Sequence, residues 1–178
     1  MWCSQSAWSA TDDGFGSSAQ VIPSQHFSVY IKPDVDVHKL LEQMSVSPTD
    51  QKLVGQDVDR SSADKELGST LDVLLSRACD VLDMRLYSFK GNIKIFATQE
   101  QLQNFFNTKF HTKLPCTGVA FYMFDYNSIY ISAENFRREV LGHEMGHAVM
   151  SNYFVVQPSE KIQEVLAGYV EYQLRKSK

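Results

Sequence analysis

The chain has 178 residues, of which 43% are hydrophobic and 21% are charged. This balance agrees with one soluble globular domain, which we expect over residues 21–178. The net charge of -4 and the scattered lysines and arginines argue against a nucleic-acid partner, and no apolar run approaches the roughly 18 residues that a transmembrane segment needs.

The N-terminal third predicts two short elements and two irregular segments. Residues 1–20 are rich in Ser, Ala, Gly and Asp, so we expect them to be disordered. Residues 26–31 predict a strand and residues 35–44 a short helix. The segment 47–59 combines proline, glycine and aspartate with little periodicity, which predicts a mobile loop at about 47–60.

A long helix is predicted after this loop. Ser61 and Asp64 have the spacing of a capping box. Apolar residues then follow one helical face to about Leu86, namely Leu67, Leu71, Leu74, Leu75, Ala78, Val81 and Leu82. We expect this helix to pack behind a sheet.

Strands of that sheet are predicted between residues 92 and 132. Residues 92–97 alternate polar and apolar side chains, and a helix opens at Thr98 and runs towards Phe110. The segments 120–124 and 129–132 are aromatic and β-branched and flank a four-residue turn, which predicts a hairpin.

The most informative segment of the chain is His143-Glu144-Met145-Gly146-His147. Two histidines four residues apart project from one face of a helix, so both can bind one zinc ion while Glu144 lies beside a bound water. Leu141, Met145, Ala148 and Val149 fall on the opposite face, which predicts an amphipathic helix. The alternative is a half-buried helix whose histidines only satisfy local hydrogen bonds.

A catalytic zinc site uses three protein ligands and leaves a fourth position for water. The chain after His147 contains no His, Asp or Cys, so the third ligand must be Glu160, Glu164 or Glu171. All three lie on a second helix that is predicted after Pro158. We predict Glu164 as the ligand, and we expect the other two to be solvated surface carboxylates.

Small residues on both helices predict that the helices approach each other closely. They are Gly142 and Gly146 on the first helix and Ala167 and Gly168 on the second.

The HExxH helix followed by a Glu-x-x-Ala helix resembles the gluzincin branch of the zincin metallopeptidases, and is similar to small bacterial zincin-like proteins with a C-terminal HExxH. The resemblance covers about residues 93–178. It implies an α+β, zincin-like fold with a small mixed sheet, packing helices, the HExxH helix and a C-terminal helix that carries the third ligand. The sequence departs from the family at Gly168, where an acidic residue usually orients a zinc histidine. Glu139 either takes that role or is a plain surface carboxylate.

The resemblance implies a zinc-dependent metallopeptidase that acts on a peptide or protein substrate. Zn²⁺ would be held by His143, His147 and Glu164, and a zinc-bound water activated by Glu144 would attack the peptide bond. Tyr153, on the turn that leaves the zinc helix, is the expected transition-state donor, with a core aromatic as the alternative.

The resemblance also implies that substrate binds along an edge strand of the sheet. Since few residues follow the zinc helix, we expect a shallow, open cleft whose pocket walls come from 47–59 and from the turn around Tyr153. Two alternatives belong to other classes of protein, a zincin-fold binding module with a vestigial metal and a scaffold with a structural metal. Glu144 argues against both, because a structural site needs no general base.

Two features of the sequence leave the cellular compartment open. Cys79 and Cys116 either form a disulfide in an oxidising compartment or remain free thiols. The first residues lack the basic and apolar regions of a signal peptide, which favours the cytoplasm unless a leader has been removed.

Overall fold

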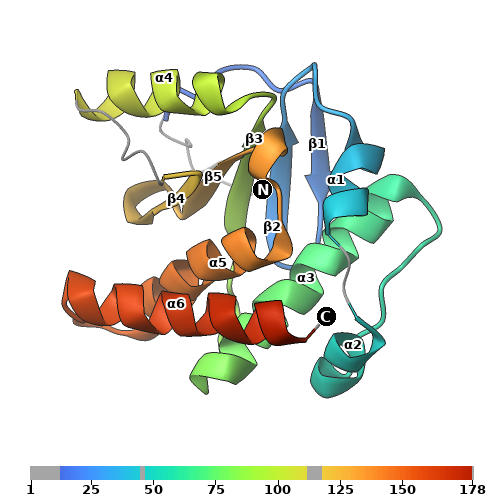
Figure 1. Cartoon of the computed structure of the whole chain (residues 1–178), viewed down its shortest axis with the longest axis vertical. Coiled ribbons are helices and arrows are strands. Elements are labelled where there is room, and N and C mark those ends of the chain that lie inside the picture. The colour runs from blue at the N-terminus through green and yellow to red at the C-terminus, as the bar shows by residue number, and fades with distance from the viewer. Residues whose placement is uncertain (1–12, 45–46, 112–117, 178) are drawn as a thin grey trace, which may run out of the picture.

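The computed structural model describes residues 13–44, 47–111 and 118–177. These residues form an α+β structure with a five-stranded mixed sheet and six α-helices (Figure 1). In chain order the elements are β1 (Gln20–Pro23), β2 (Phe27–Ile31), α1 (Val37–Gln43), α2 (Pro48–Val54), α3 (Ala63–Leu82), β3 (Gly91–Phe96), α4 (Gln99–Phe110), β4 (Ala120–Met123), the 3₁₀ turn η1 (Phe124–Tyr126), β5 (Ser128–Ser132), the 3₁₀ turn η2 (Ala133–Asn135), α5 (Arg138–Tyr153) and α6 (Glu160–Lys176). In the described ranges, every helix is too short or too polar to cross a membrane.

The sheet has the strand order β1-β2-β3-β5-β4. Its three central strands are parallel, and β1 and β4 pair antiparallel at the two edges. Parallel neighbours need long crossover connections, which α3 and α4 supply within the links from β2 to β3 and from β3 to β5. The predicted hairpin therefore ends the sheet, with β4 as an edge strand beside β5.

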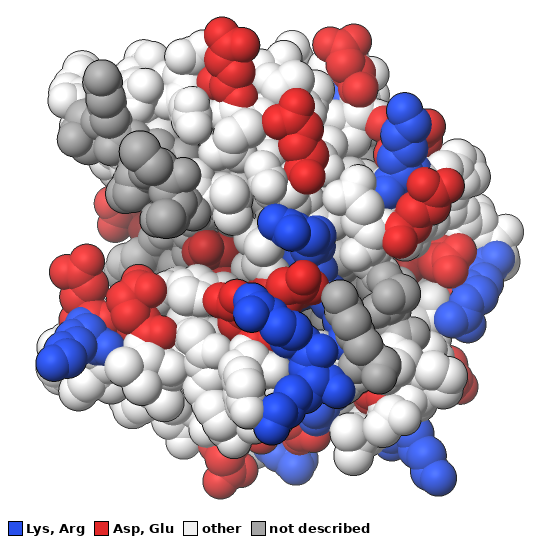
Figure 2. Space-filling model, in the orientation of Figure 1, with Lys and Arg blue, Asp and Glu red and all other residues white. Residues whose placement is uncertain are grey.

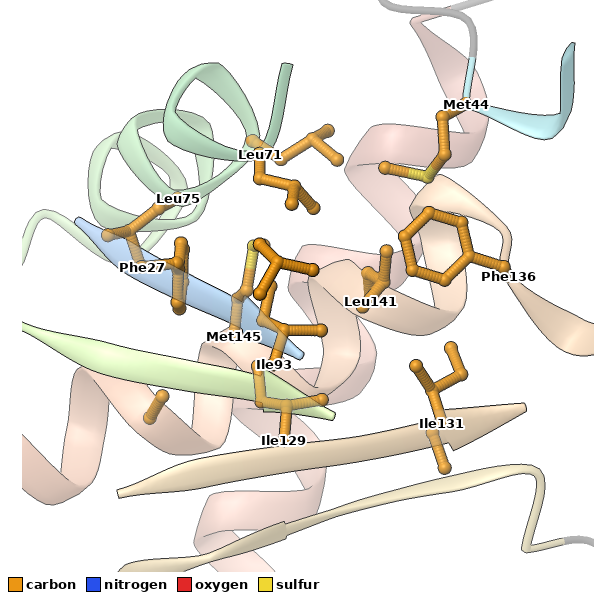
Figure 3. Close-up of a cluster of buried hydrophobic side chains, with 14 of the residues drawn as sticks. Phe27, Met44, Leu71, Leu75, Ile93, Ile129, Ile131, Phe136, Leu141 and Met145 are labelled. Carbon is orange, nitrogen blue, oxygen red and sulfur yellow. The ribbon is translucent and has the colours of Figure 1, made fainter. Parts of the chain in front are cut away.

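One face of the sheet packs against α3 and α5 and forms the larger core. Because side chains alternate along a strand, every second residue of β2, β3 and β5 points to this face. Figure 3 shows strand residues Phe27, Ile93, Ile129 and Ile131 against Leu71 and Leu75 of α3 and Leu141 and Met145 of α5. This contact fixes α5, the helix with the HExxH motif, against the sheet.

The opposite face of the sheet is covered by α4 (Figure 1). Phe96 and Tyr130 from the strands pack with Leu102 of α4 in a second, aromatic core. Phe105 of α4 stacks on Tyr130 with a ring-centroid distance of 5.0 Å.

The segment 13–20 is ordered, so the expectation of disorder is wrong there, while residues 1–12 lie outside the described residues. Phe15 is buried in the aromatic core. The buried Asp13 pairs with Lys94 and accepts a hydrogen bond from the Tyr130 hydroxyl. The strand β1, which we did not predict, follows directly. The polar composition of this segment gave no sign that Asp13 and Phe15 would be buried against residues far along the chain.

The predicted mobile loop at 47–60 is also wrong, because it contains the helix α2. Ser47 caps the helix by accepting the Asp50 N–H at 3.1 Å, and Gly55 ends it with a left-handed φ of 65°. The Asp50 carboxylate is buried and lies 3.3 Å from Arg77 Nε and 3.4 Å from Arg138 Nη1. These ion pairs tie α2 to α3 and α5. The sequence signal was Ser47 followed by proline at the first helical position.

The remaining predicted elements are confirmed within a few residues. Two details of α3 differ from the prediction. Ser62 rather than Ser61 caps the helix, since its hydroxyl accepts the Lys65 N–H at 3.3 Å. The helix ends at Leu82, because Asp83 adopts a left-handed conformation with φ 53°.

Candidate metal centre

The helix α5 presents the motif histidines while its other faces are buried. Leu141, Met145, Ala148 and Val149 are fully buried, as the helical pattern predicts. The His143 and His147 side chains are only 23% and 15% exposed. The helix therefore offers two partly shielded imidazoles on a rigid support.

The helices α5 and α6 pack closely and lie side by side in Figure 1. A Cβ atom added at Gly142 would overlap Leu174 of α6, and one added at Gly146 would lie 3.1 Å from the Ala167 backbone. These positions confirm the predicted close approach. Gly168 does not contribute to it, since a Cβ there would meet nothing within 4 Å.

This packing brings Glu164 to the two histidines. Nε2 of His143 and Nε2 of His147 lie 3.3 Å apart. The two carboxylate oxygens of Glu164 lie 3.4 Å from His143 Nε2 and 3.3 Å from His147 Nε2. The predicted ligands are thus brought together, with one donor atom from each within 4.8 Å of the others.

The 3.3 Å separation of the two histidine nitrogens is close to that of neighbouring ligands in a zinc site. In a tetrahedral site with bonds of about 2.1 Å, neighbouring donor atoms lie about 3.4 Å apart. Burial and the neighbouring His143 lower the pKa of His147, which favours the neutral imidazole that a metal needs. The Glu164 side chain is 57% exposed, so the group of ligands is open to solvent on one side.

Glu171 orients His143, and our expectation that Glu171 is a solvated surface carboxylate is wrong. Its Oε2 lies 3.2 Å from His143 Nδ1. When Nδ1 donates its proton to this carboxylate, Nε2 keeps a lone pair towards Glu164 and His147. The signal in the sequence was the seven-residue spacing from Glu164, which is two helical turns. Glu160, by contrast, is exposed as expected.

Glu144 lies beside the ligands in a buried position, with 8% of its surface exposed. Burial raises its pKa to about 8, and the charges of Glu164 and Glu171 act in the same direction. The backbone N–H of Tyr122 in β4 hydrogen-bonds to the carboxylate and acts in the opposite direction. A cation held by the histidines would also favour the charged carboxylate.

A groove of about 570 Å³ opens at this site. One wall carries both histidines with Glu144 and Glu164, and the other is formed by the edge strand β4, Phe106 of α4 and Phe124. The candidate metal ligands, the buried Glu144 carboxylate and the edge strand β4 therefore line the same open groove.

Two predicted parts of the cleft lie elsewhere. Tyr153 is the last residue of α5 and lines a separate hollow with Tyr87 and Phe89. Leu53 and Gln56, from the segment predicted as a pocket wall, line a third hollow beside α3. Tyr153 therefore lies away from the candidate metal ligands. It comes six residues after His147 on the helix, and this spacing points its side chain in another direction. Cys79 forms no disulfide within the described residues, and Cys116 lies outside them.

The comparisons with known proteins provide no family for this chain. No protein-family model matches it, and neither do the curated proteins or the solved structures.

Proposed function

We propose that this protein is a zinc-dependent metallopeptidase with a zincin-like fold. The observation that supports this most is the triangle of donor atoms from His143, His147 and Glu164, with the buried Glu144 next to it. A purely structural zinc site is closed and needs no carboxylate beside the ligands. Here the ligands face an open groove, which favours catalysis over the scaffold alternative.

Each residue of the site has a role in this proposal. His143, His147 and Glu164 would hold the metal, and Glu171 would orient His143. When bound, zinc supplies Lewis acidity that makes a water acidic and polarises a carbonyl group. Glu144 accepts a proton from the attacking water and passes it to the leaving amine.

The edge strand β4 would position an extended peptide. The N–H of Tyr122 is directed at Glu144 and so away from β5. Backbone groups alternate sides along a strand, so Ala120, two residues earlier, directs its N–H and C=O to the same side. A peptide that pairs with the main-chain groups of Ala120 would lie in the groove beside Glu144, and main-chain pairing makes little demand on its sequence.

The proposal is tested by metal content and proteolysis on the same preparation. We expect about one zinc per chain and hydrolysis of an unstructured protein such as casein, lost with a chelator and restored by zinc. Glu144→Gln should keep the zinc, because Glu144 is not a ligand, and should slow hydrolysis roughly 10²–10⁴-fold by removing the general base.

The three outcomes separate the proposed enzyme from its alternatives. A protein that binds no zinc contradicts the metal site. Zinc binding without any peptide hydrolysis favours the binding-module alternative. Equal hydrolysis by the wild type and Glu144→Gln assigns the activity to another mechanism or to a contaminant.

A further inference from the structure

The groove beside the candidate metal centre has an aromatic wall. Phe106 of α4, Phe121 of β4 and Phe124 of η1 line the groove together with the candidate ligands, and we call these three residues the aromatic wall. The rings of Phe106 and Phe121 meet edge to face with their centroids 5.0 Å apart, and both residues are half-buried. Phe124 is 61% exposed. Apolar side chains that line a groove together with a few polar groups are typical of a binding site.

The aromatic wall and the candidate ligands lie on different faces of the edge strand β4. Ala120 and Tyr122 of β4 pack into the larger core, on the side of α5. Phe121 lies between them and points to the other face, where it stacks on Tyr130 with a centroid distance of 5.0 Å. In Figure 1, β4 lies at the edge of the sheet between α4 and the pair of α5 and α6. The groove therefore extends around this edge, from the ligands on α5 to Phe106 on α4.

We propose that the aromatic wall binds an aromatic or large aliphatic side chain of an extended peptide substrate, an inference that rests on the proposed function. A peptide residue that pairs with Ala120 directs its side chain to the α5 face, because directly opposite residues share a face of the sheet. One neighbour of that residue in the peptide then lies opposite Phe121 and directs its side chain to the α4 face. Cβ atoms of directly opposite residues are about 4.5–5.5 Å apart, so this second side chain contacts the aromatic wall.

The charges in the groove disfavour an acidic side chain at this position. Among the described residues that line the groove, Glu144 and Glu164 are the acidic ones, and none is Lys or Arg. Figure 2 shows acidic side chains in the region between β4 and the N-terminal end of α6. An aspartate of the peptide placed against the aromatic wall would lose hydration without gaining a cationic partner. We therefore expect phenylalanine or leucine to be preferred and aspartate to be disfavoured.

Binding and cleavage of a peptide series test this inference. The peptides are identical except at one residue, which is phenylalanine, leucine, alanine, lysine or aspartate. The zinc-loaded Glu144→Gln variant keeps the proposed ligands and lacks the general base. It should bind the phenylalanine and leucine peptides roughly tenfold more tightly than the alanine peptide, as measured by fluorescence anisotropy. The wild type should cleave the phenylalanine peptide at one fixed distance from the phenylalanine, which mass spectrometry identifies.

Variants of the aromatic wall, made in the Glu144→Gln background, test where the preference arises. Phe124→Ala and Phe106→Ala should each reduce the preference for phenylalanine over alanine roughly threefold or more, since an aromatic contact is lost, and should leave the zinc content unchanged. Tyr87→Ala is the matched control, because Tyr87 is an aromatic residue that is 94% exposed and lines a hollow away from the groove. Circular dichroism should show the variants folded. If Phe106→Ala unfolds, the variant of the exposed Phe124 decides the test.

The outcomes separate this inference from the proposed function. Equal binding of the phenylalanine and alanine peptides overturns the aromatic wall as a binding site, as does a preference for lysine or aspartate. A phenylalanine preference that Phe124→Ala leaves intact overturns it equally. Selective binding that depends on Phe124, without hydrolysis by the wild type, supports the binding site and overturns the proposed peptidase activity. Hydrolysis without any selectivity supports the peptidase and overturns this inference.

Discussion

At the residue scale, Glu171 determines which nitrogen His143 presents to the candidate metal. A histidine has two ring nitrogens, and the hydrogen bond at one of them sets the lone pair of the other. The 3.2 Å contact between Glu171 and Nδ1 leaves Nε2 for the metal. This orienting carboxylate comes seven residues beyond Glu164 on the same helix.

This role predicts a graded loss of zinc affinity. Glu171→Ala should weaken zinc binding roughly 10–100-fold, because the histidine loses its orienting partner. Glu164→Ala should weaken it further, since that change removes a ligand. Glu160→Ala, on the exposed first turn of the same helix, is the control and should have no effect. Competition with a coloured zinc chelator measures all three, and equal affinities of Glu171→Ala and the control would exclude the role of Glu171.

At the scale of elements, two glycines in the α5 and α6 pair have opposite environments. A Cβ atom at Gly142 would overlap the end of the buried Leu174 side chain, which would have to move. Gly168 lies within α6 and has open space around its Cα atom. The candidate metal site depends on Gly142, since the close approach of α6 to α5 brings Glu164 to the histidines.

Alanine at these glycines should shift stability in opposite directions. Gly142→Ala should lower the free energy of unfolding by about 1–3 kcal/mol through overpacking and should weaken zinc binding. Gly168→Ala should raise it by up to about 1 kcal/mol, since alanine is the better helix former. Denaturant unfolding of the metal-free protein gives both values. A stabilised Gly142→Ala protein would show that the helices are not held as closely as described.

At the scale of the whole molecule, the segment before β1 is joined to the centre of the sheet. Asp13 contacts Lys94 of β3 and Tyr130 of β5 and accepts the Phe15 N–H at 3.0 Å. Burial by itself raises the pKa of Asp13, but the hydrogen bonds from Lys94, Tyr130 and Phe15 outweigh it and lower the pKa below its ordinary value of 3.8. The charged carboxylate is therefore favoured in the folded state.

This shift predicts how acid affects the stability of the fold. The stabilisation is fully present above the unfolded pKa of about 3.8 and is lost as the pH falls through the lower folded pKa. Asp13→Asn should therefore cost about 1–3 kcal/mol at pH 7, and this difference should shrink below pH 3.8. Unfolding curves at pH 7 and pH 3 measure it, and a difference that stays constant with pH would contradict the predicted ionisation.

The features that could be predicted from the sequence alone are those that local periodicity determines. The repeat of apolar residues fixes which face of a helix or strand is buried, so the histidine face of α5, the strands β2 to β5 and the helix with Glu164 could be predicted, whereas the strand β1 was missed. The metallopeptidase activity stays a prediction. Only the tertiary structure shows which faces meet. It shows the contact of Glu171 with His143, the separate hollow that Tyr153 lines, and the ion pairs of the buried Asp13 and Asp50. Each of these depends on residues far apart in the chain, and spacing within one element does not determine which residues of another element it will contact.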